Sequence, residues 1–112
     1  MTGSLRGLKV LDFSTLLPGP MATLFLAEAG AEVIKIERTG TGEDMRYYPP
    51  TWGESSVNFS LLNRGKKSVT VDLKNKSERD KLMPLIEKAD IVVEQFRPGV
   101  MARLELDYES IK

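Results

Sequence analysis

The segment Gly30–Gly42 constrains the fold most, because a short apolar strand here runs directly into charged residues and glycine. Its apolar positions are Val33, Ile34 and Ile36, a run typical of a strand covered on both faces. Glu37 and Arg38 follow where that strand would end. Ligands of open α/β sheets bind beyond the carboxyl ends of the strands, so the segment predicts a binding edge. A guanidinium beside a flexible glycine turn suits an anionic group such as phosphate.

Length and composition exclude several classes of protein. The 112 residues suffice for one small domain with one core. The 16 basic and 16 acidic residues cancel, which argues against nucleic acid or an anionic membrane as the main partner. The sequence has no cysteine and no histidine, so we predict no disulfide and no metal site. No secretory signal and no apolar run of about 18 residues is visible, and we expect a cytoplasmic protein.

Strand and helix signals alternate along the chain. Strands are predicted at residues 9–13, 32–37, 67–72 and 91–94, and helices at 20–29, 57–62, 77–88, 98–104 and from Tyr108 onward. This order predicts an α/β fold, namely a Rossmann-like open parallel sheet with flanking helices. Ser77 is a candidate N-cap of the third helix, and Pro84 predicts a kink or an early break within it. Residues 39–56 predict a long polar loop, and loops of this length are often functional.

The turn after the first strand argues against a dinucleotide fold. The G-x-G-x-x-G pattern lets backbone N–H groups reach a pyrophosphate, but residues 14–20 hold one glycine and two prolines. Cations instead follow three of the predicted strands, at Arg38, Lys74 and Arg97, and Arg103 lies on the helix after the last of them. Their recurrence at one edge of the sheet favours a polyanionic ligand.

No catalytic constellation is evident in the sequence. Asp12 ends the first strand, where an acid could act, but the sequence identifies no partner base. Ser14 and Thr15 lack a histidine and an obvious activating lysine. The basic turn at residues 63–67 predicts a solvated loop, with phosphate neutralisation as the alternative. We therefore predict a binding site and assign no catalytic residue.

Seven segments, taken together, resemble the family III CoA-transferases, or CaiB–BaiF family. They are Leu8–Phe13, Pro18–Pro20, Leu26–Arg38, Gly42–Arg46, Asn63–Lys74, Ala89–Glu94 and Phe96–Met101. The segments occur in family order and cover nearly the whole chain. The family includes formyl-CoA transferase-like enzymes and α-methylacyl-CoA racemase-like enzymes. The full-length loop before Asn63 resembles the transferase branch more closely.

The resemblance implies that residues 1–112 are the N-terminal Rossmann-like CoA-binding segment of a longer chain, whose subunits interlock as a homodimer. It places Arg38 and Arg103 against phosphates of coenzyme A, and Leu73 and Lys74 near its adenosine. It also implies that Gln95 and Phe96 line the path of the cofactor. The family often has asparagine where Gln95 stands, so the amide here is one methylene further out. Arg97 joins the expected cofactor-binding residues from its place after the fourth strand.

The resemblance also implies a reaction that these 112 residues cannot perform alone. The family's catalytic aspartate attacks an acyl-CoA carbonyl, forming a mixed anhydride and then an enzyme–CoA thioester. That aspartate lies downstream, and none of the aspartates present here occupies its motif. The expected function is the CoA-binding part of an acyl-CoA:carboxylate CoA-transferase, inactive by itself, with an acyl-CoA and a carboxylic acid as substrates. The alternatives are a racemase segment and a stand-alone CoA or nucleotide-binding module without catalysis.

Overall fold

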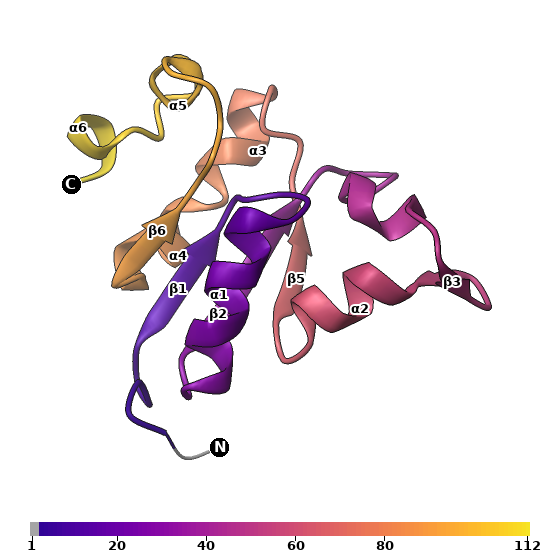
Figure 1. The fold of residues 1–112 in the computed structure, drawn as a ribbon. Coiled ribbons are helices and arrows are strands. Elements are labelled where there is room, and N and C mark those ends of the chain that lie inside the picture. The colour runs from indigo at the N-terminus through magenta and orange to yellow at the C-terminus, as the bar shows by residue number, and fades with distance from the viewer. Residues whose placement is uncertain (1–2) are drawn as a thin grey trace.

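The chain folds around a four-stranded parallel sheet with helices on both faces (Figure 1). The computed structural model describes residues 3–112. The strands of the sheet are β1 (Lys9–Asp12), β2 (Glu32–Glu37), β5 (Lys67–Thr70) and β6 (Ile91–Val93). Their order is β5-β2-β1-β6, and every neighbouring pair is parallel. This is the strand order of half a Rossmann fold, so the predicted α/β class is confirmed.

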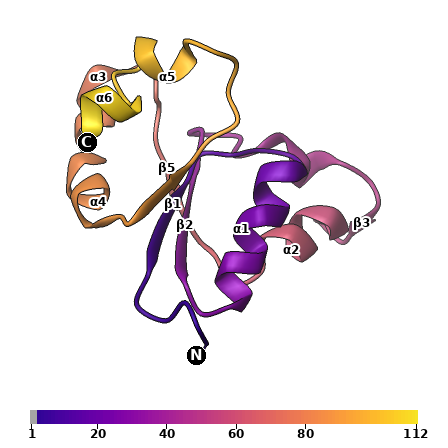
Figure 2. The same ribbon diagram turned by 60° about the vertical axis from the view of Figure 1, so that its left-hand side comes forward.

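The helices form a layer on each side of the sheet (Figure 2). Helices α1 (Pro18–Glu28) and α2 (Val57–Asn63) pack together on one face. The other face carries α3 (Lys76–Asp80), α4 (Met83–Lys88), α5 (Val100–Arg103) and α6 (Tyr108–Ile111). The connections from β1 to β5 therefore run on one face of the sheet, and those after β5 run on the other. The neighbouring strands β1 and β6 lead into connections on opposite faces.

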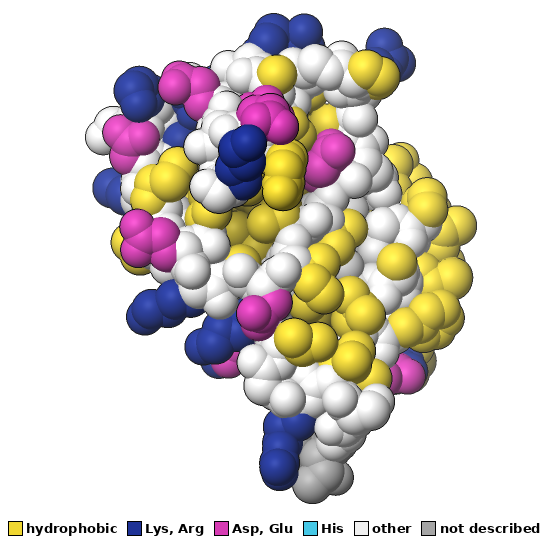
Figure 3. Space-filling model, turned by 90° about the vertical axis from the view of Figure 1, so that its left-hand side faces the viewer, with side chains coloured by type: hydrophobic (Ala, Val, Ile, Leu, Met, Phe, Trp, Pro, Cys, Tyr) yellow, Lys and Arg dark blue, Asp and Glu magenta, His cyan; other side chains and the backbone are white. Residues whose placement is uncertain are grey.

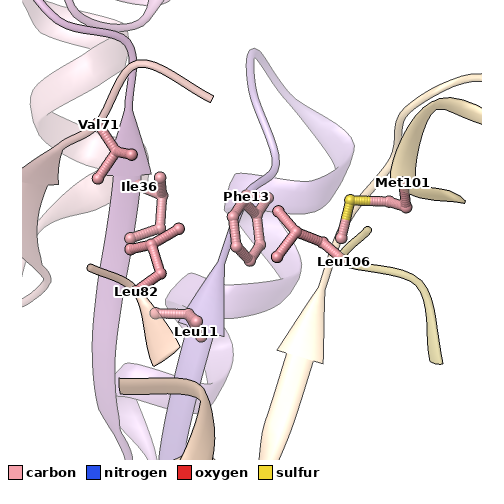
Figure 4. Packing of buried hydrophobic residues seen from close by; sticks show 7 residues of the cluster. All are labelled: Leu11, Phe13, Ile36, Val71, Leu82, Met101 and Leu106. Atoms are coloured by element: carbon pink, nitrogen blue, oxygen red, sulfur yellow. The ribbon is translucent and has the colours of Figure 1, made fainter. Parts of the chain in front are cut away.

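Alternating side chains of the strands build two separate cores. Leu11 and Ile36 point toward the face of α3–α6, where they join a cluster completed by Phe13, Val71, Leu82, Met101 and Leu106 (Figure 4). Val10 and Val33, which alternate with them, pack against Ala27 and Ala31 beside α1. The period of two along β1 and β2 thus buries both faces of these central strands, whereas β5 at the edge of the sheet is exposed.

Pro84 breaks the predicted third helix in two. Helix α3 ends at Asp80, and α4 begins at Met83 with Pro84 in its first turn, where a missing N–H costs no helical bond. The predicted early break is confirmed. The predicted N-cap was wrong, because α3 begins before Ser77 and the Asn75 side chain accepts from the backbone N–H of Glu78 at 3.3 Å.

The long segment between β2 and α2 is more structured than the sequence suggests. It contains a 3-10 helix, η1 (Asp44–Tyr47), and a small antiparallel hairpin of β3 (Thr51–Trp52) and β4 (Ser55–Ser56). The Glu43 side chain caps η1 by accepting from the N–H of Met45 at 2.6 Å. Two-residue strands and a single 3-10 turn are too short to create a detectable hydrophobic period, so the sequence predicts only a loop.

Hydrophobic side chains are exposed over α1 and in a neighbouring hollow (Figure 3). On α1 they include Met21 and Phe25, one turn apart. The hollow, about 460 Å³ in volume, lies between β6 and helices α4, α5 and α6. Among residues 3–112, no helix combines the length and the apolar composition needed to cross a membrane.

Leu82 tests the larger core. Its side chain is 1% exposed, whereas neighbouring Met83 is 36% exposed. We expect Leu82→Ala to lower the free energy of unfolding by about 3 kcal/mol, because truncation leaves a cavity that the core fills only in part. Met83→Ala should cost less than about 1 kcal/mol. Urea unfolding followed by circular dichroism measures both, and equal losses would contradict the assigned core.

Candidate functional site

A pocket of about 550 Å³ opens at the carboxyl ends of the four parallel strands. Its wall is apolar and is built from Phe13, Ile36, Val71, Leu73 and Phe96, which all belong to or pack on the larger core. Its rim is polar and consists of Thr15, Arg38, Thr39, Gly42, Asp44, Asp72 and Lys74, and the buried residues Glu37 and Glu43 complete the lining. This is the position at which open α/β sheets bind ligands.

The rim carries both signs of charge. Arg38 follows β2, and its Nε donates to the carbonyl of Gly42 at 3.0 Å. Its guanidinium also pairs with Asp44, and both side chains are more than half exposed. Lys74 and Asp72 contribute a second cation and a second exposed carboxylate beyond the end of β5. The rim is therefore more balanced in charge than the recurrence of cations in the sequence suggests.

The structure brings four of the seven predicted cofactor-binding residues to this pocket, namely Arg38, Leu73, Lys74 and Phe96. Gln95 lies beside it, with its amide bonded to the loop that follows β1. Arg97 and Arg103 are not among the lining residues, and the Arg103 guanidinium lies beside Gly99. Ligand binding by all seven residues stays a prediction.

Glu37 ends β2 and is buried, although the sequence suggests that it emerges there. It is 3% exposed, and Arg46 Nε and Nη2 each reach its carboxylate at 2.7 Å. The N–H of Glu43 donates to it at 2.8 Å, and the Ser68 hydroxyl donates to it as well. Burial alone raises the pKa of Glu37, but these hydrogen bonds outweigh burial and lower the pKa to about 2.

Lys35 lies on the same face of β2 and is also buried. Its Nζ is 3.0 Å from Glu43 Oε1 and donates to the carbonyl of Ser14 at 3.1 Å. The ring of Phe59 covers the neighbouring Arg46, whose guanidinium carbon is 4.0 Å from the ring centroid. Two ion pairs therefore join β2 to the segment that carries η1: Lys35–Glu43 is buried on both sides, whereas Arg46 is partly exposed beside buried Glu37.

Asp12 is fully buried at the end of β1, where it organises the following turn. It accepts from the N–H of Ser14 at 2.8 Å and from the Thr23 hydroxyl at 2.5 Å. Lys66 Nζ lies 3.6 Å from it and donates to the carbonyl of Pro20 at 2.9 Å. Burial lowers the pKa of Lys66 to about 8, although the charge of Asp12 acts in the opposite direction. The prediction of a solvated basic turn was therefore wrong for Lys66, and Asp12 has a structural role.

The sequence does contain a signal for the ion pairs of Lys35 and Glu37. Lys35 and Glu37 are at alternate positions of an apolar strand, so both share the face of Val33. Charged residues on the covered face of a strand require partners of opposite sign. The pattern could have predicted ion pairs for Lys35 and Glu37, but it does not identify Glu43 and Arg46 as their partners.

The fold and pocket together define a Rossmann-like α/β protein with a candidate ligand site at the carboxyl edge of its sheet. The model of CoA-transferase family III matches residues 5–112. An acetyl-CoA:oxalate CoA-transferase of Acetobacter aceti is 44% identical over 97% of this chain and 28% of its own length. A formyl-CoA:oxalate CoA-transferase of Afipia carboxidovorans is 40% identical over 100% of this chain and 27% of its own length.

A solved structure agrees with these relatives. The crystal structure of a CAIB/BAIF family protein from Brucella suis superposes with a TM-score of 0.91 at 38% identity, covering 100% of this chain and 31% of that one. The chain thus belongs to CoA-transferase family III, and the resemblance stated from its motifs is confirmed. It spans somewhat more than a quarter of the length of the curated relatives that it matches.

Glu37 gives the free energy of unfolding a measurable pH dependence. Because its pKa falls from an ordinary value of 4.5 to about 2 in the folded chain, its contribution to stability is present above pH 4.5 and is lost as the pH falls toward 2. The full contribution is about 3 kcal/mol. We expect Glu37→Gln to be destabilised at pH 7 and to approach the wild-type stability near pH 2. Urea unfolding from pH 2 to 7 measures this convergence.

Exposed Glu54 provides the matched control for that measurement. Glu54→Gln should leave the free energy of unfolding close to the wild-type value at every pH. A constant difference between wild type and Glu37→Gln from pH 2 to pH 7 would contradict the assigned charge state of Glu37.

Proposed function

We propose that the chain is the N-terminal CoA-binding part of an acyl-CoA:carboxylate CoA-transferase, and that the pocket receives the nucleotide end of coenzyme A. One observation carries the proposal. Arg38 and Lys74, which follow two different strands, line the same pocket as Leu73 and Phe96. A mixed lining of cations and apolar side chains suits a ligand that joins phosphates to an aromatic base.

Arg38 is the proposed phosphate ligand. Its guanidinium is more than half exposed and is held at the rim by Gly42 and Asp44. An exposed ion pair of this kind contributes little stability, so a phosphate can replace the Asp44 carboxylate at low cost. The planar guanidinium then donates two parallel hydrogen bonds to phosphate oxygens. Lys74 adds a second positive charge from beyond the end of β5.

The apolar wall is the proposed site of the adenine ring. Leu73 and Phe96 are partly buried against the larger core, so their positions are fixed while their outer surfaces line the pocket. An aromatic ring beside an aliphatic side chain offers a flat apolar surface for a purine. The preformed wall reduces the entropy lost when the ligand binds.

The chemical step is proposed to use residues outside this chain. Asp12, the aspartate closest to the loop after β1, is fully buried and bonded to Ser14, Thr23 and Lys66, so it cannot attack a thioester. The reaction proposed for the whole protein moves CoA from an acyl-CoA to a carboxylic acid. We further propose that the whole protein is a cytoplasmic homodimer with interlocked subunits. A racemase branch is the alternative for the same segment, and the long loop before Asn63 favours the transferase.

A stand-alone CoA-binding module is the second candidate. It is favoured by the origin of the pocket, whose wall and rim come from the ends of all four strands of the parallel sheet. Such a module would bind coenzyme A without transferring it. A transfer assay that supplies an acyl-CoA and oxalate separates the two candidates when it is run on the longest polypeptide that contains this sequence.

The binding proposal is tested by titrating coenzyme A into the purified 112-residue chain. We expect Arg38→Ala to weaken binding at least tenfold, because hydrogen bonds between charged groups contribute about 1.5–3 kcal/mol. Lys74→Ala should weaken binding less, and rising salt should weaken binding by the wild type. Isothermal titration calorimetry measures these affinities.

Two further variants sharpen the titration. Arg64→Ala removes an exposed arginine that pairs with Glu28 away from the pocket, and it should leave the affinity unchanged. Asp44→Asn removes the carboxylate that competes for Arg38, and it should raise the affinity several-fold. Equal losses in Arg38→Ala and Arg64→Ala would contradict the site, as would a folded wild-type chain that binds no coenzyme A.

A further inference from the structure

Gln95 joins the loop after β6 to the segment between β1 and the start of α1, which is far away in the sequence. Its Oε1 accepts from the N–H of Gly19 at 2.9 Å, and its Nε2 donates to the carbonyl of Thr15 at 2.6 Å. The amide is thus bonded at one end to the loop between β1 and α1, and at the other end to the first turn of α1. The side chain itself is exposed, so these bonds do not serve to bury it.

These bonds lie at the point where the topology of the sheet changes direction. Strands β1 and β6 are neighbours, but β1 continues into α1 on one face and β6 leads toward α5 on the other. Loops that diverge in this way leave a crevice between them, which is the usual ligand position in an open α/β sheet. In this chain the Gln95 amide spans the crevice and ties its two sides together.

The loop fits closely around this contact. A Cβ atom on Gly19 would lie 2.5 Å from Gln95 Oε1 and would also collide with the Ser14 side chain. Any side chain at position 19 would therefore push the loop away from Gln95. Gly19 thus permits the close approach of Gln95. In a dinucleotide fold, by contrast, the glycines of this turn permit the approach of a pyrophosphate.

The same loop contains a strained residue. Leu16 has φ of 66°, in the left-handed region that a leucine rarely adopts. Such a conformation persists only where its surroundings hold it. Gln95 holds Thr15 and Gly19 on the two sides of Leu16, and Asp12 holds the N–H of Ser14 just before it. Gln95 supplies the attachment from outside the β1–α1 unit.

We propose that Gln95 is a positioning residue that holds residues 15–19 across the crevice and so fixes the Thr15 side of the ligand pocket. Thr15 lines that pocket, whereas Gln95 is not among its lining residues. Gln95 acts on ligand affinity through the loop that it holds. The effect on coenzyme A rests on the proposed function, but the effect on the loop does not.

Gln95→Met tests the proposal, because methionine has a similar length and offers no amide. We expect hydrogen exchange at the Gly19 N–H to become at least tenfold faster. Backbone order parameters of residues 15–19 should fall toward the flexible range, below about 0.6. The affinity for coenzyme A should fall about fivefold. Gln95→Glu keeps an acceptor for Gly19 and loses the donor to Thr15, so its exchange and affinity should fall between those of wild type and Gln95→Met.

A second substitution separates positioning from direct contact. Leu16→Asn relieves the strain, because asparagine tolerates the left-handed region better than leucine does. In the Gln95→Met background it should restore the order parameters of the loop and most of the lost affinity. Direct contact between Gln95 and the ligand predicts no such rescue.

The outcomes distinguish this proposal from the proposed function. Unchanged Gly19 exchange and loop order in Gln95→Met, together with a loss of affinity, would overturn the positioning role. A chain that binds no coenzyme A, yet shows faster Gly19 exchange and a disordered loop in Gln95→Met, would support the loop attachment and overturn the nucleotide site.

Discussion

Ionic contacts hold the long segment after β2 against the sheet, and the pocket depends on them. All the side chains in these contacts are buried except that of Arg46, which is partly exposed. Three carboxylates and three cations take part, and their charges cancel: Asp12, Glu37, Glu43, Lys35, Arg46 and Lys66. The strands supply three of these residues, and the segment from Glu43 to Lys66 supplies the other three. Because a buried charge without its partner is strongly destabilising, the segment can dock only where all the pairs form.

This arrangement positions the rim through chain neighbours. Glu37 and Glu43 are buried, and the N–H of Glu43 donates to the Glu37 carboxylate. Arg38 follows Glu37 and Asp44 follows Glu43, so this bond brings Arg38 and Asp44 together at the surface, where they pair. Buried pairs thus set the geometry, while the exposed pair above them stays free to exchange partners. If Arg38 binds phosphate as proposed, little binding energy is then needed to organise its side chain.

The features that sequence analysis predicted are those with local causes. Strands β1, β2 and β6 follow from short apolar runs, and the break at Pro84 follows from one residue that lacks an N–H. The alternation of strands and helices along the chain also restricts the order of strands in the sheet to a few possibilities. The ionic network was not predicted, because its pairs join residues up to 54 positions apart, as in the contact of Asp12 with Lys66. Periodicity shows which face Lys35 occupies, but it does not show which distant side chain meets it there.

The candidate site was predicted in part for a related reason. The rule that parallel strands end at one edge places backbones, but it does not place side chains. Gln95 and Phe96 are adjacent beyond β6, yet Phe96 joins the pocket wall and the larger core, whereas Gln95 reaches the loop of α1 on the other side of the crevice. Arg97 and Arg103 are a second example. Both follow the carboxyl end of β6 in the sequence, but neither lines the pocket. A residue's place after a strand therefore identifies candidates for ligand contact, and the direction of the following connection decides which of them line the pocket.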